Sequence, residues 1–311
     1  MNILVIGAGS RTASVLVPML LDETTASIHL ASSARIASDH ERITSHQLDV
    51  TRREDLHNLV LSVMPNAVVN LVAYTDVDGC EQDRALAWRI NVTLVEHLAR
   101  ACRSADAQLI HVSTDYVFDG SRGPYAETDT VGPVSYYGKS KLAGENALAT
   151  SGIDWSVVRT NVVYGTMADK PDFLAWVLQR FDAREPVKAV TDQYSNPTFC
   201  DDLCETIIEL INRRRTGIYH TGGTDYLSRY EFVTRVADLF HVPTSLVVPV
   251  TTADLNQTAR RPIRGGLITL KTSSELGVRM TSVEHGLVAF RYRLLQKTKP
   301  PQGLMRGLQG T

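Results

Sequence analysis

The sequence has 311 residues and a mass of 34.3 kDa, enough for one large domain or two modest ones. Its 32 Lys and Arg residues nearly balance its 34 Asp and Glu residues, which excludes a general nucleic-acid binder. No window approaches about 18 uninterrupted apolar residues and the N-terminus has no basic flank, so we expect a cytoplasmic protein without a membrane segment. The four scattered cysteines predict reduced thiols, and no metal site is expected.

Apolar runs typical of strands alternate with helical patterns through the first half of the chain. In chain order we expect a strand over 2–7, a helix over 11–21, a strand over 27–31, a helix over 53–64, a strand over 67–72, a helical stretch over 84–105, a strand over 108–114, a helix over 138–150 and a strand over 155–160. Repeated β-α-β units with continuous apolar strands predict an α/β fold, a Rossmann-type doubly wound parallel sheet.

The alternation breaks down after residue 163, where the segments become less regular. We therefore expect a dinucleotide-binding domain over 1–163 and a smaller, mainly substrate-binding domain over 164–311. The chain is expected to cross back to the first domain near 189–222. The last stretch, 296–311, is basic and contains Gly and Pro, which predicts a flexible tail.

The first predicted strand runs into GAGSRTA at 7–13, the place where a Rossmann sheet holds a dinucleotide. Gly7 and Gly9 permit a tight turn, and with Ser10 they bring helix N–H groups toward a pyrophosphate. The last glycine of a GxGxxG pattern falls at Thr12, so a simple tight turn remains an equal alternative for this motif.

The end of the second predicted strand indicates which cofactor is bound. The segment LASSAR, 30–35, has no acid for the ribose hydroxyl of NAD. Hydroxyl and guanidinium groups suit a 2′-phosphate, and they come from Arg11, Ser32, Ser33 and Arg35. NADP(H) is therefore favoured, NAD(H) remains possible, and Arg35 as a plain surface residue is the alternative. Asp49 and Val50 are expected at the adenine edge.

Tyr137 and Lys141 are four residues apart and share one face of a helix. An ammonium beside a phenol lowers the phenol pKa from about 10 and lets it exchange a proton near neutral pH. A hydroxyl at the end of the 108–114 strand, from Thr114 or Ser113, can hydrogen-bond the same substrate oxygen. YxxxK alone more often marks a packed tyrosine and a solvated lysine, but the glycine turn and the strand-end hydroxyl favour carbonyl reduction beside a nicotinamide.

Segments along nearly the whole chain resemble one known family. They are VVNLVAYTDVDGCEQD (68–83), RINV around Asn91, HVSTDYVFDG, PYAETD, YYGKSKLAGE, RTNVVYG (159–165), DQYSNPT (192–198), GIYHTGG, SRYEF and RRP (260–262). The chain resembles the extended short-chain dehydrogenase/reductases, and within them the dTDP-4-dehydrorhamnose reductase group. The resemblance implies hydride transfer from a reduced nicotinamide to the 4-keto carbon of a dTDP-linked 6-deoxyhexose.

The resemblance also implies residue roles. Thr114 would orient the carbonyl, Tyr137 would protonate the forming alkoxide, and Lys141 would hold the nicotinamide ribose, with Asn91 as a helix-bending or water-holding support. The implied cofactor contacts after the 67–72 strand are Val72, Ala73 and Tyr74. The implied substrate contacts are Thr75, Asp115, Tyr116, Val162, Gln193, Asn196 and Arg261.

The sequence departs from the family pattern at several positions. Ser10 and Ala13 stand where the glycine turn has glycine, and Ser195 replaces a glycine in the 192–198 segment. Val162 stands where the family has a tryptophan. Losing that indole removes a broad apolar wall near the sugar, so the identity of the sugar stays open.

Two alternative functions remain. Epimerisation or dehydration can occur on the same scaffold, although related dehydratases resemble STDEVYG and carry Glu where this chain has Tyr116. A non-catalytic role is the other, because the regulatory beta subunit of methionine adenosyltransferase resembles this group too. The expected partners are a nucleotide-sugar substrate and, at the level of the family, a second copy in a homodimer.

Overall fold

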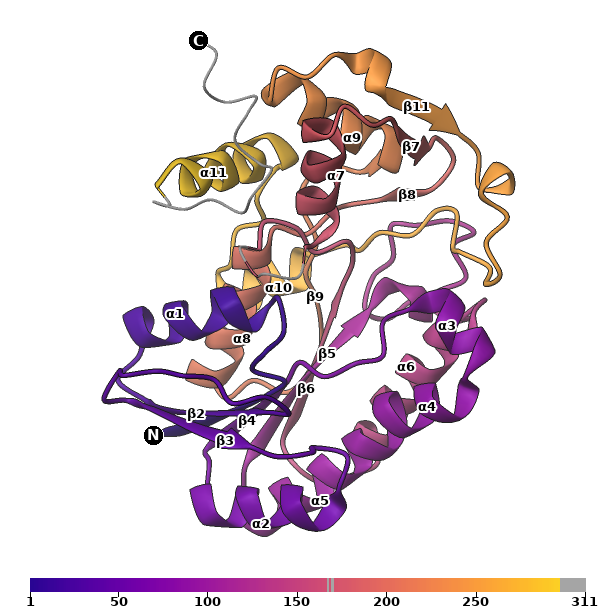
Figure 1. Cartoon of the computed structure of the whole chain (residues 1–311). Helices are drawn as coiled ribbons and strands as arrows, with labels where there is room; N and C mark the ends of the chain where they lie inside the picture. Colours follow the sequence, from indigo (N-terminus) through magenta and orange to yellow (C-terminus); the bar gives the residue numbers. More distant parts are fainter. Residues whose placement is uncertain (167, 169–170, 297–311) are drawn as a thin grey trace.

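The computed structural model describes residues 1–166, 168 and 171–296, and its centre is a parallel sheet (Figure 1). Within the described residues this sheet has the strand order β3-β2-β1-β4-β5-β6-β9, and each neighbouring pair is parallel. The strands are β1 (Asn2–Ile6), β2 (Ser27–Ser32), β3 (Ile43–Gln47), β4 (Ala67–Asn70), β5 (Gln108–Thr114), β6 (Trp155–Thr160) and β9 (Gly217–His220). The predicted doubly wound parallel sheet is confirmed.

Helices cover both faces of the sheet, which explains why its central strands are largely apolar. Alternate residues of β1 point to opposite faces: Ile3 and Val5 pack with α1 (Ala13–Glu23) and α8 (Cys200–Asn212). Leu4 and Ile6 pack with helices on the other face. Those helices are α2 (Arg53–Val63), α5 (Leu94–Ala105) and α6 (Tyr136–Ala149).

The chain returns to the sheet in its second half. Helix α8 packs on α1, and β9 pairs with β6 through a register that joins Ser156 to Gly217. Strand β9 therefore belongs to the sheet and α8 to the helices that cover it, although both follow residue 163. The division at residue 163 remains a prediction, and this crossing lies inside the predicted 189–222 range.

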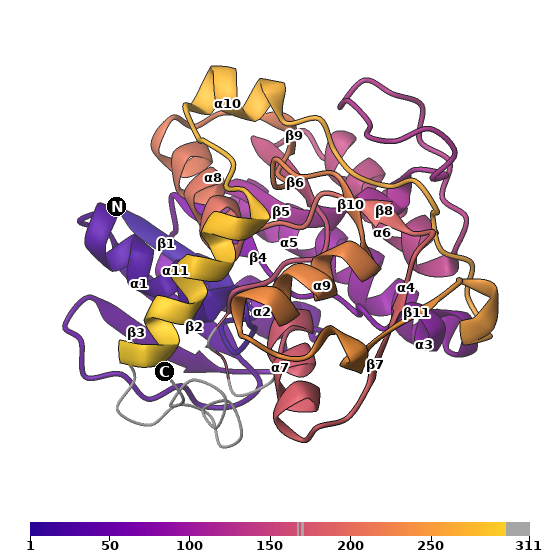
Figure 2. The ribbon, with the colours of Figure 1, turned by 90° about the horizontal axis from the view of Figure 1, so that it is seen from above.

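A second group of elements covers the carboxyl ends of the strands (Figures 1 and 2). It has its own apolar core, in which Phe181, Phe232 and Phe290 are almost fully buried. Its helices and strands are α7 (Phe173–Asp182), β7 (Val187–Val190), β8 (Tyr194–Ser195), β10 (Leu227–Ser228), α9 (Arg229–Leu239), β11 (Val247–Val250) and α11 (Val283–Gln296). Strands β7 and β11 are parallel, and β8 and β10 are antiparallel. Helix α10 (Leu270–Leu276) packs instead against α8 and β9. Across the described ranges, no helix has the length and apolarity that crossing a membrane requires.

The predicted helical stretch over 84–105 is interrupted. It consists of α4 (Arg84–Trp88), a π-helical turn (Arg89–Thr93) and α5, and a separate short helix, α3 (Val77–Gln82), precedes it. The predicted helix over 138–150 begins earlier, at Tyr136, because the Ser135 hydroxyl accepts a hydrogen bond from the Gly138 N–H and caps the first turn. The predicted tail lies outside the described residues except for Gln296, the last residue of α11.

Candidate active site

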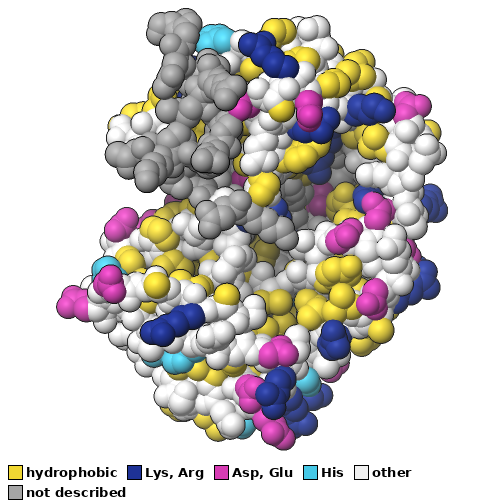
Figure 3. All heavy atoms as spheres, viewed as in Figure 1, with side chains coloured by type: hydrophobic (Ala, Val, Ile, Leu, Met, Phe, Trp, Pro, Cys, Tyr) yellow, Lys and Arg dark blue, Asp and Glu magenta, His cyan; other side chains and the backbone are white. Residues whose placement is uncertain are grey.

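A cleft of about 1330 Å³ lies where the carboxyl ends of the strands meet the second group of elements. The space-filling view shows the molecule hollowed at this level (Figure 3). The loops after β1, β4, β5 and β6 line one wall, and residues of α7, β7 and α9 line the other. Ligands of open parallel sheets bind at this edge, where loops from several strands converge.

The glycine turn after β1 forms one part of the cleft. Gly7 has a φ of 83°, and a Cβ there would lie 2.8 Å from Val72 Cγ2, so this position requires glycine. Gly9 faces open space, because a Cβ there would meet no atom within 4 Å. The Ser10 hydroxyl accepts a hydrogen bond from the Ala13 N–H at 3.2 Å, so this departure from the glycine pattern caps α1. The open position at Gly9 beside the start of α1 fits the pyrophosphate of a dinucleotide.

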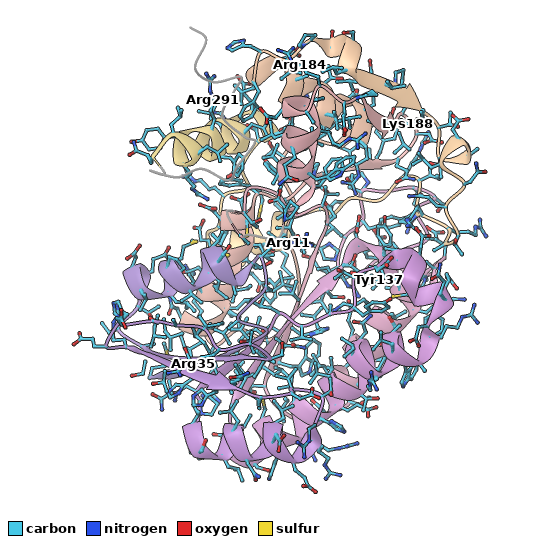
Figure 4. All side chains as sticks on the ribbon, in the orientation of Figure 1. Arg11, Arg35, Tyr137, Arg184, Lys188 and Arg291 are labelled. Atoms are coloured by element: carbon cyan, nitrogen blue, oxygen red, sulfur yellow. The ribbon has the colours of Figure 1, made fainter. Side chains whose placement is uncertain are left out.

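The predicted 2′-phosphate residues do not form one cluster. Arg11 lines the cleft, and its Nη1 donates to the Pro171 carbonyl at 2.7 Å. Ser33 and Arg35 are exposed beyond the end of β2, and Figure 4 shows Arg35 well apart from Arg11. The Ser32 hydroxyl is buried and donates to the Ala34 carbonyl, which leaves it structural in this arrangement.

The two residues predicted at the adenine edge follow β3. The Asp49 carboxylate is exposed and accepts hydrogen bonds from the Thr51 N–H and hydroxyl, which lower its pKa. Val50 is half-buried and packs against the core under α2. Both lie outside the described lining of the cleft, so an adenine contact stays a prediction.

Tyr137 and Lys141 lie on α6 at the floor of the cleft, beside Thr114 at the end of β5. Figure 4 shows Tyr137 at the end of α6 next to the cleft. Burial raises the pKa of Tyr137, and a hydrogen bond from the Thr114 side chain opposes that rise only in part. Tyr137 is therefore a neutral phenol at neutral pH, which suits a proton donor better than a proton acceptor.

The predicted effect of Lys141 on this phenol is wrong for the structure as it stands. Lys141 Nζ lies 3.1 Å from His111 Nε2 and donates to the Val112 carbonyl at 2.8 Å, and the pKa of Tyr137 is raised instead of lowered. The physical reason is burial: desolvation of the phenol raises the pKa of Tyr137, and desolvation of Lys141, which is 1% exposed, lowers its own pKa to about 8.

Asn91 joins two elements of the site by hydrogen bonds without lining the cleft. It is fully buried in the π-helical turn, where its Oδ1 accepts from the Tyr74 N–H and its Nδ2 donates to the Ser140 hydroxyl on α6. These bonds tie the loop after β4 to the helix that carries Tyr137. Its role as a helix-bending or water-holding support stays a prediction, and Asn91 and Tyr74 are not part of the described cleft lining.

The predicted sugar-side residues divide into two groups. Thr75 and Tyr116 line the cleft, as does the predicted cofactor contact Ala73, and the Tyr116 ring meets the Tyr137 ring edge-on with centroids 5.7 Å apart. Asp115 is 2% exposed and points away: its carboxylate accepts from the Gly266 N–H at 3.2 Å, and burial raises its pKa to about 6. Its geometry fits a support for the wall rather than a direct contact.

Val162 lines the cleft with a φ of 33°, a conformation that is strained for a β-branched residue. The strand-end backbone here is held by the Thr198 N–H, which is shared between the Asn161 and Val162 carbonyls at 3.3 Å. A strained residue therefore occupies the position where the resemblance leads us to expect an indole.

Three predicted substrate contacts come from the second half of the chain. Gln193 and Arg261 line the cleft, although Arg261 is bound in an ion pair with Asp78 at 2.8 Å. Asn196 does not line it. Its Oδ1 accepts from Asn161 and from the Leu267 N–H, and its Nδ2 donates to the Gly223 and Leu267 carbonyls. This fully used amide corrects the expectation for Asn196, which joins loops instead of facing the cleft.

Comparison with known proteins identifies the family. The family model described as the RmlD substrate binding domain matches residues 1–295. This chain belongs to that family. A dTDP-4-dehydrorhamnose reductase from Aggregatibacter actinomycetemcomitans is 31% identical over 304 residues, covering 93% of this chain and 98% of that protein. One from Mycobacterium tuberculosis (strain H37Rv) is 37% identical over 237 residues, covering 74% and 77%. The crystal structure of dTDP-4-dehydrorhamnose reductase from Bacillus anthracis in complex with NADP has a TM-score of 0.83 and 28% identity, covering 94% of this chain and 99% of that one.

In this member of the RmlD substrate-binding family, the sequence reasoning overlooked two cations of the cleft. Arg229 begins α9, lies near Tyr116 and Asp115, and is stacked on the Phe173 ring at 5.0 Å. Lys188 of β7 is exposed on the same wall as Arg229. Neither is in an ion pair with another residue that the structure describes. The segment SRYEF contained the signal for Arg229, but only the fold places it opposite Tyr137.

Proposed function

We propose that this chain is an NADP(H)-dependent oxidoreductase that reduces the 4-keto group of a dTDP-linked 6-deoxyhexose. The observation that carries the proposal is the position of Tyr137, a buried neutral phenol at the floor of the same cleft that contains the open glycine turn at Gly9. A proton donor and a dinucleotide site in one cleft are what carbonyl reduction requires. The family and its dTDP-4-dehydrorhamnose reductase members support the choice of substrate.

Residues of this chain can be assigned to each step of the proposed reaction. Gly9 and the backbone N–H groups of the turn that leads into α1 would hold the pyrophosphate, and the nicotinamide would supply the hydride. Thr114 would orient the keto oxygen by donating its hydroxyl hydrogen, and Tyr137 would donate the proton that neutralises the alkoxide. Lys141 would hold the nicotinamide ribose and return a proton to Tyr137.

The substrate diphosphate needs positive charge on the other wall. Arg229 and Lys188 line that wall without an ion-pair partner in the described part of the chain, whereas the charge of Arg261 is already shared with Asp78. We therefore assign the diphosphate first to Arg229, and we keep Arg261 and Gln193 as weaker contacts. Cofactor choice depends on the exposed Ser33 and Arg35, which favour the 2′-phosphate of NADP(H).

The deciding experiment follows the absorbance of reduced nicotinamide when the protein meets a dTDP-4-keto-6-deoxyhexose generated in situ. We expect oxidation of NADPH at a higher rate than NADH, with one equivalent of reduced sugar formed per cofactor consumed. Tight NADPH binding with no oxidation would contradict the proposal and favour a non-catalytic role. Conversion of the sugar without net cofactor consumption would favour epimerisation or dehydration.

A further inference from the structure

A chain of buried polar groups leads from the loop after β4 to Lys141. The Val72 N–H donates to Asn70 Oδ1 at 3.1 Å, Asn70 Nδ2 lies 3.0 Å from His111 Nδ1, and His111 Nε2 lies 3.1 Å from Lys141 Nζ. The chain ends where Lys141 Nζ donates to the Val112 carbonyl at 2.8 Å. Asn70, His111 and Lys141 are each at most 1% exposed, so water does not compete for these bonds.

The direction of each hydrogen bond follows from its neighbour. Because a backbone N–H can only donate, Asn70 must present its oxygen to Val72 and its NH₂ group to His111. His111 Nδ1 must then accept, which places the ring hydrogen of the neutral imidazole on Nε2. That hydrogen points at Lys141 Nζ. An ammonium has no lone pair to accept it, whereas a neutral amine does.

We propose that Asn70 and His111 are positioning residues that fix the Nε2–H tautomer of His111 and thereby stabilise the neutral amine that the Lys141 ammonium becomes when it gives up a proton. The contact is then satisfied at every atom from Val72 to Val112. With an ammonium, two N–H groups would face each other at 3.1 Å in a buried site, which is costly because neither group can turn to water.

The charges around Lys141 agree with this assignment. Burial and the nearby Lys141 hold the pKa of His111 well below its usual range, so the imidazole stays neutral. Burial lowers the pKa of Lys141, and Glu145, on the same helix, is the charge that opposes this. Glu145 is occupied by a buried ion pair with Arg159 of β6 at 2.7 Å and by the Ser113 hydroxyl. The phenol of Tyr137, also on α6, is neutral, so the direct partners of Nζ are the His111 ring and the Val112 carbonyl, both on β5.

In the proposed reductase function, on which this step rests, the tautomer of His111 assists the return of a proton from Lys141 to Tyr137. When the ammonium form of Lys141 gives a proton to the phenolate that Tyr137 becomes, the Tyr137 O–H bond re-forms and Nζ is left as a neutral amine with a lone pair. His111 Nε2–H is already placed to donate to that lone pair. The pair would therefore stabilise the product of the proton return and let Lys141 exchange protons near neutral pH.

The first test reads the tautomer in the wild-type protein without cofactor or substrate. Histidine labelled with ¹⁵N distinguishes the protonated ring nitrogen from the unprotonated one in a long-range ¹H–¹⁵N NMR spectrum, and the His111→Phe variant assigns the His111 signals by their loss. We expect a neutral ring with hydrogen on Nε2 and a bare Nδ1 at pH 8.5. A ring protonated on Nδ1 alone, or on both nitrogens, would overturn the inference.

The second test reverses the tautomer. In Asn70→Asp, carboxylate oxygens face both Val72 N–H and His111 Nδ1, so hydrogen moves to Nδ1 and a lone pair faces Lys141. The midpoint of Lys141 titration, followed through its ¹³Cε shift in ¹³C-lysine-labelled protein and assigned with Lys141→Met, should rise by at least about one pH unit. In a His111→Phe background the same substitution should shift the midpoint by less than half as much. An equal shift in both backgrounds would show that the new carboxylate acts on Lys141 through its charge alone. That result would contradict the role proposed for His111.

Neither measurement uses turnover, so the two proposals can fail separately. A protein with the Nε2–H tautomer but no reductase activity would contradict the proposed function alone. An active reductase with hydrogen on Nδ1 would contradict this inference alone.

Discussion

The two ends of the proposed cofactor site differ in burial. At the nicotinamide end proposed here, Tyr137 is 9% exposed and Lys141 1%, and hydrogen bonds or ring contacts fix both side chains. At the proposed 2′-phosphate end, Ser33 and Arg35 are exposed beyond β2 (Figure 4). A buried polar group depends on its few protein partners, whereas an exposed one can exchange them for water. Substitutions at the buried end should therefore change chemistry and stability strongly, and those at the exposed end should change cofactor preference mildly.

The largest effect is expected for Tyr137→Phe at the buried end. Removing the phenolic hydroxyl removes the proposed proton donor, so turnover should fall by about 10²–10⁴-fold. Cofactor affinity should be unchanged, because the ring remains. Tyr136→Phe on the same turn is the matched control and should keep full turnover. Undiminished reduction by Tyr137→Phe, measured by steady-state kinetics, would show that another group is the acid.

Lys141→Met should make the folded protein more stable although it removes a proposed catalytic group. The folded-state pKa of Lys141 is lowered to about 8, so at lower pH folding has to bury an ammonium. Below pH 8 the free energy of unfolding of the variant should therefore exceed that of the wild type by roughly 1–3 kcal/mol. The difference should shrink as pH rises from about 8 toward 10.5, as the unfolded lysine also loses its proton. Urea unfolding at pH 7 and pH 10 measures this, and a pH-independent difference would contradict it.

The glycine turn between the two ends offers a matched pair. Gly7→Ala places a Cβ 2.8 Å from Val72 Cγ2 in a left-handed backbone, and should destabilise the protein by about 1–3 kcal/mol. Gly9→Ala meets no protein atom within 4 Å, so thermal unfolding should be unchanged. NADPH affinity should nevertheless fall by about tenfold in Gly9→Ala, because the methyl group enters the proposed pyrophosphate space. If calorimetry gave the same NADPH affinity for wild type and Gly9→Ala, the pyrophosphate would have to bind away from Gly9.

Arg229 tests the wall opposite Tyr137. Arg229→Gln should weaken dTDP binding by about tenfold, the loss of one charge-assisted contact, while NADPH binding is retained. Arg184→Gln, at a position that Figure 4 shows far from the cleft, is the control and should bind dTDP normally. Should calorimetry give the same affinity for all three proteins, the diphosphate would have to bind at Lys188 or Arg261.

The smallest effect is expected at the exposed end. Arg35→Ala should lower the ratio of NADPH to NADH efficiency by about threefold to tenfold, because a solvent-exposed guanidinium contributes little to phosphate binding. The NADH rate in the same variant is the internal control and should not change. A loss equal for both cofactors would place Arg35 outside the 2′-phosphate contact.

Local sequence patterns predicted most of the sheet because its central strands are largely apolar, whereas the edge strand β3 has the polar sequence ITSHQ. Strand β5 was expected over 108–114 and β6 over 155–160, and both have those bounds in the structure. The pattern failed at 84–105, where a π-helical turn around Asn91 interrupts an otherwise continuous amphipathic helix. That interruption depends on bonds from Asn91 to Tyr74 and Ser140, which are distant in sequence.

The sequence by itself determined the layer architecture, the glycine turn and the YxxxK pair, because these depend on residue spacing within single elements. Only the tertiary structure decided which groups share the cleft. It placed Lys141 of α6 within hydrogen-bond distance of His111 of β5 and directed the Asn196 amide to neighbouring loops. It also brought Arg229 into the cleft opposite Tyr137. The physical reason is that burial and partner choice depend on contacts between distant elements, and these set the pKa of Tyr137 and Lys141 against the expectation from their spacing.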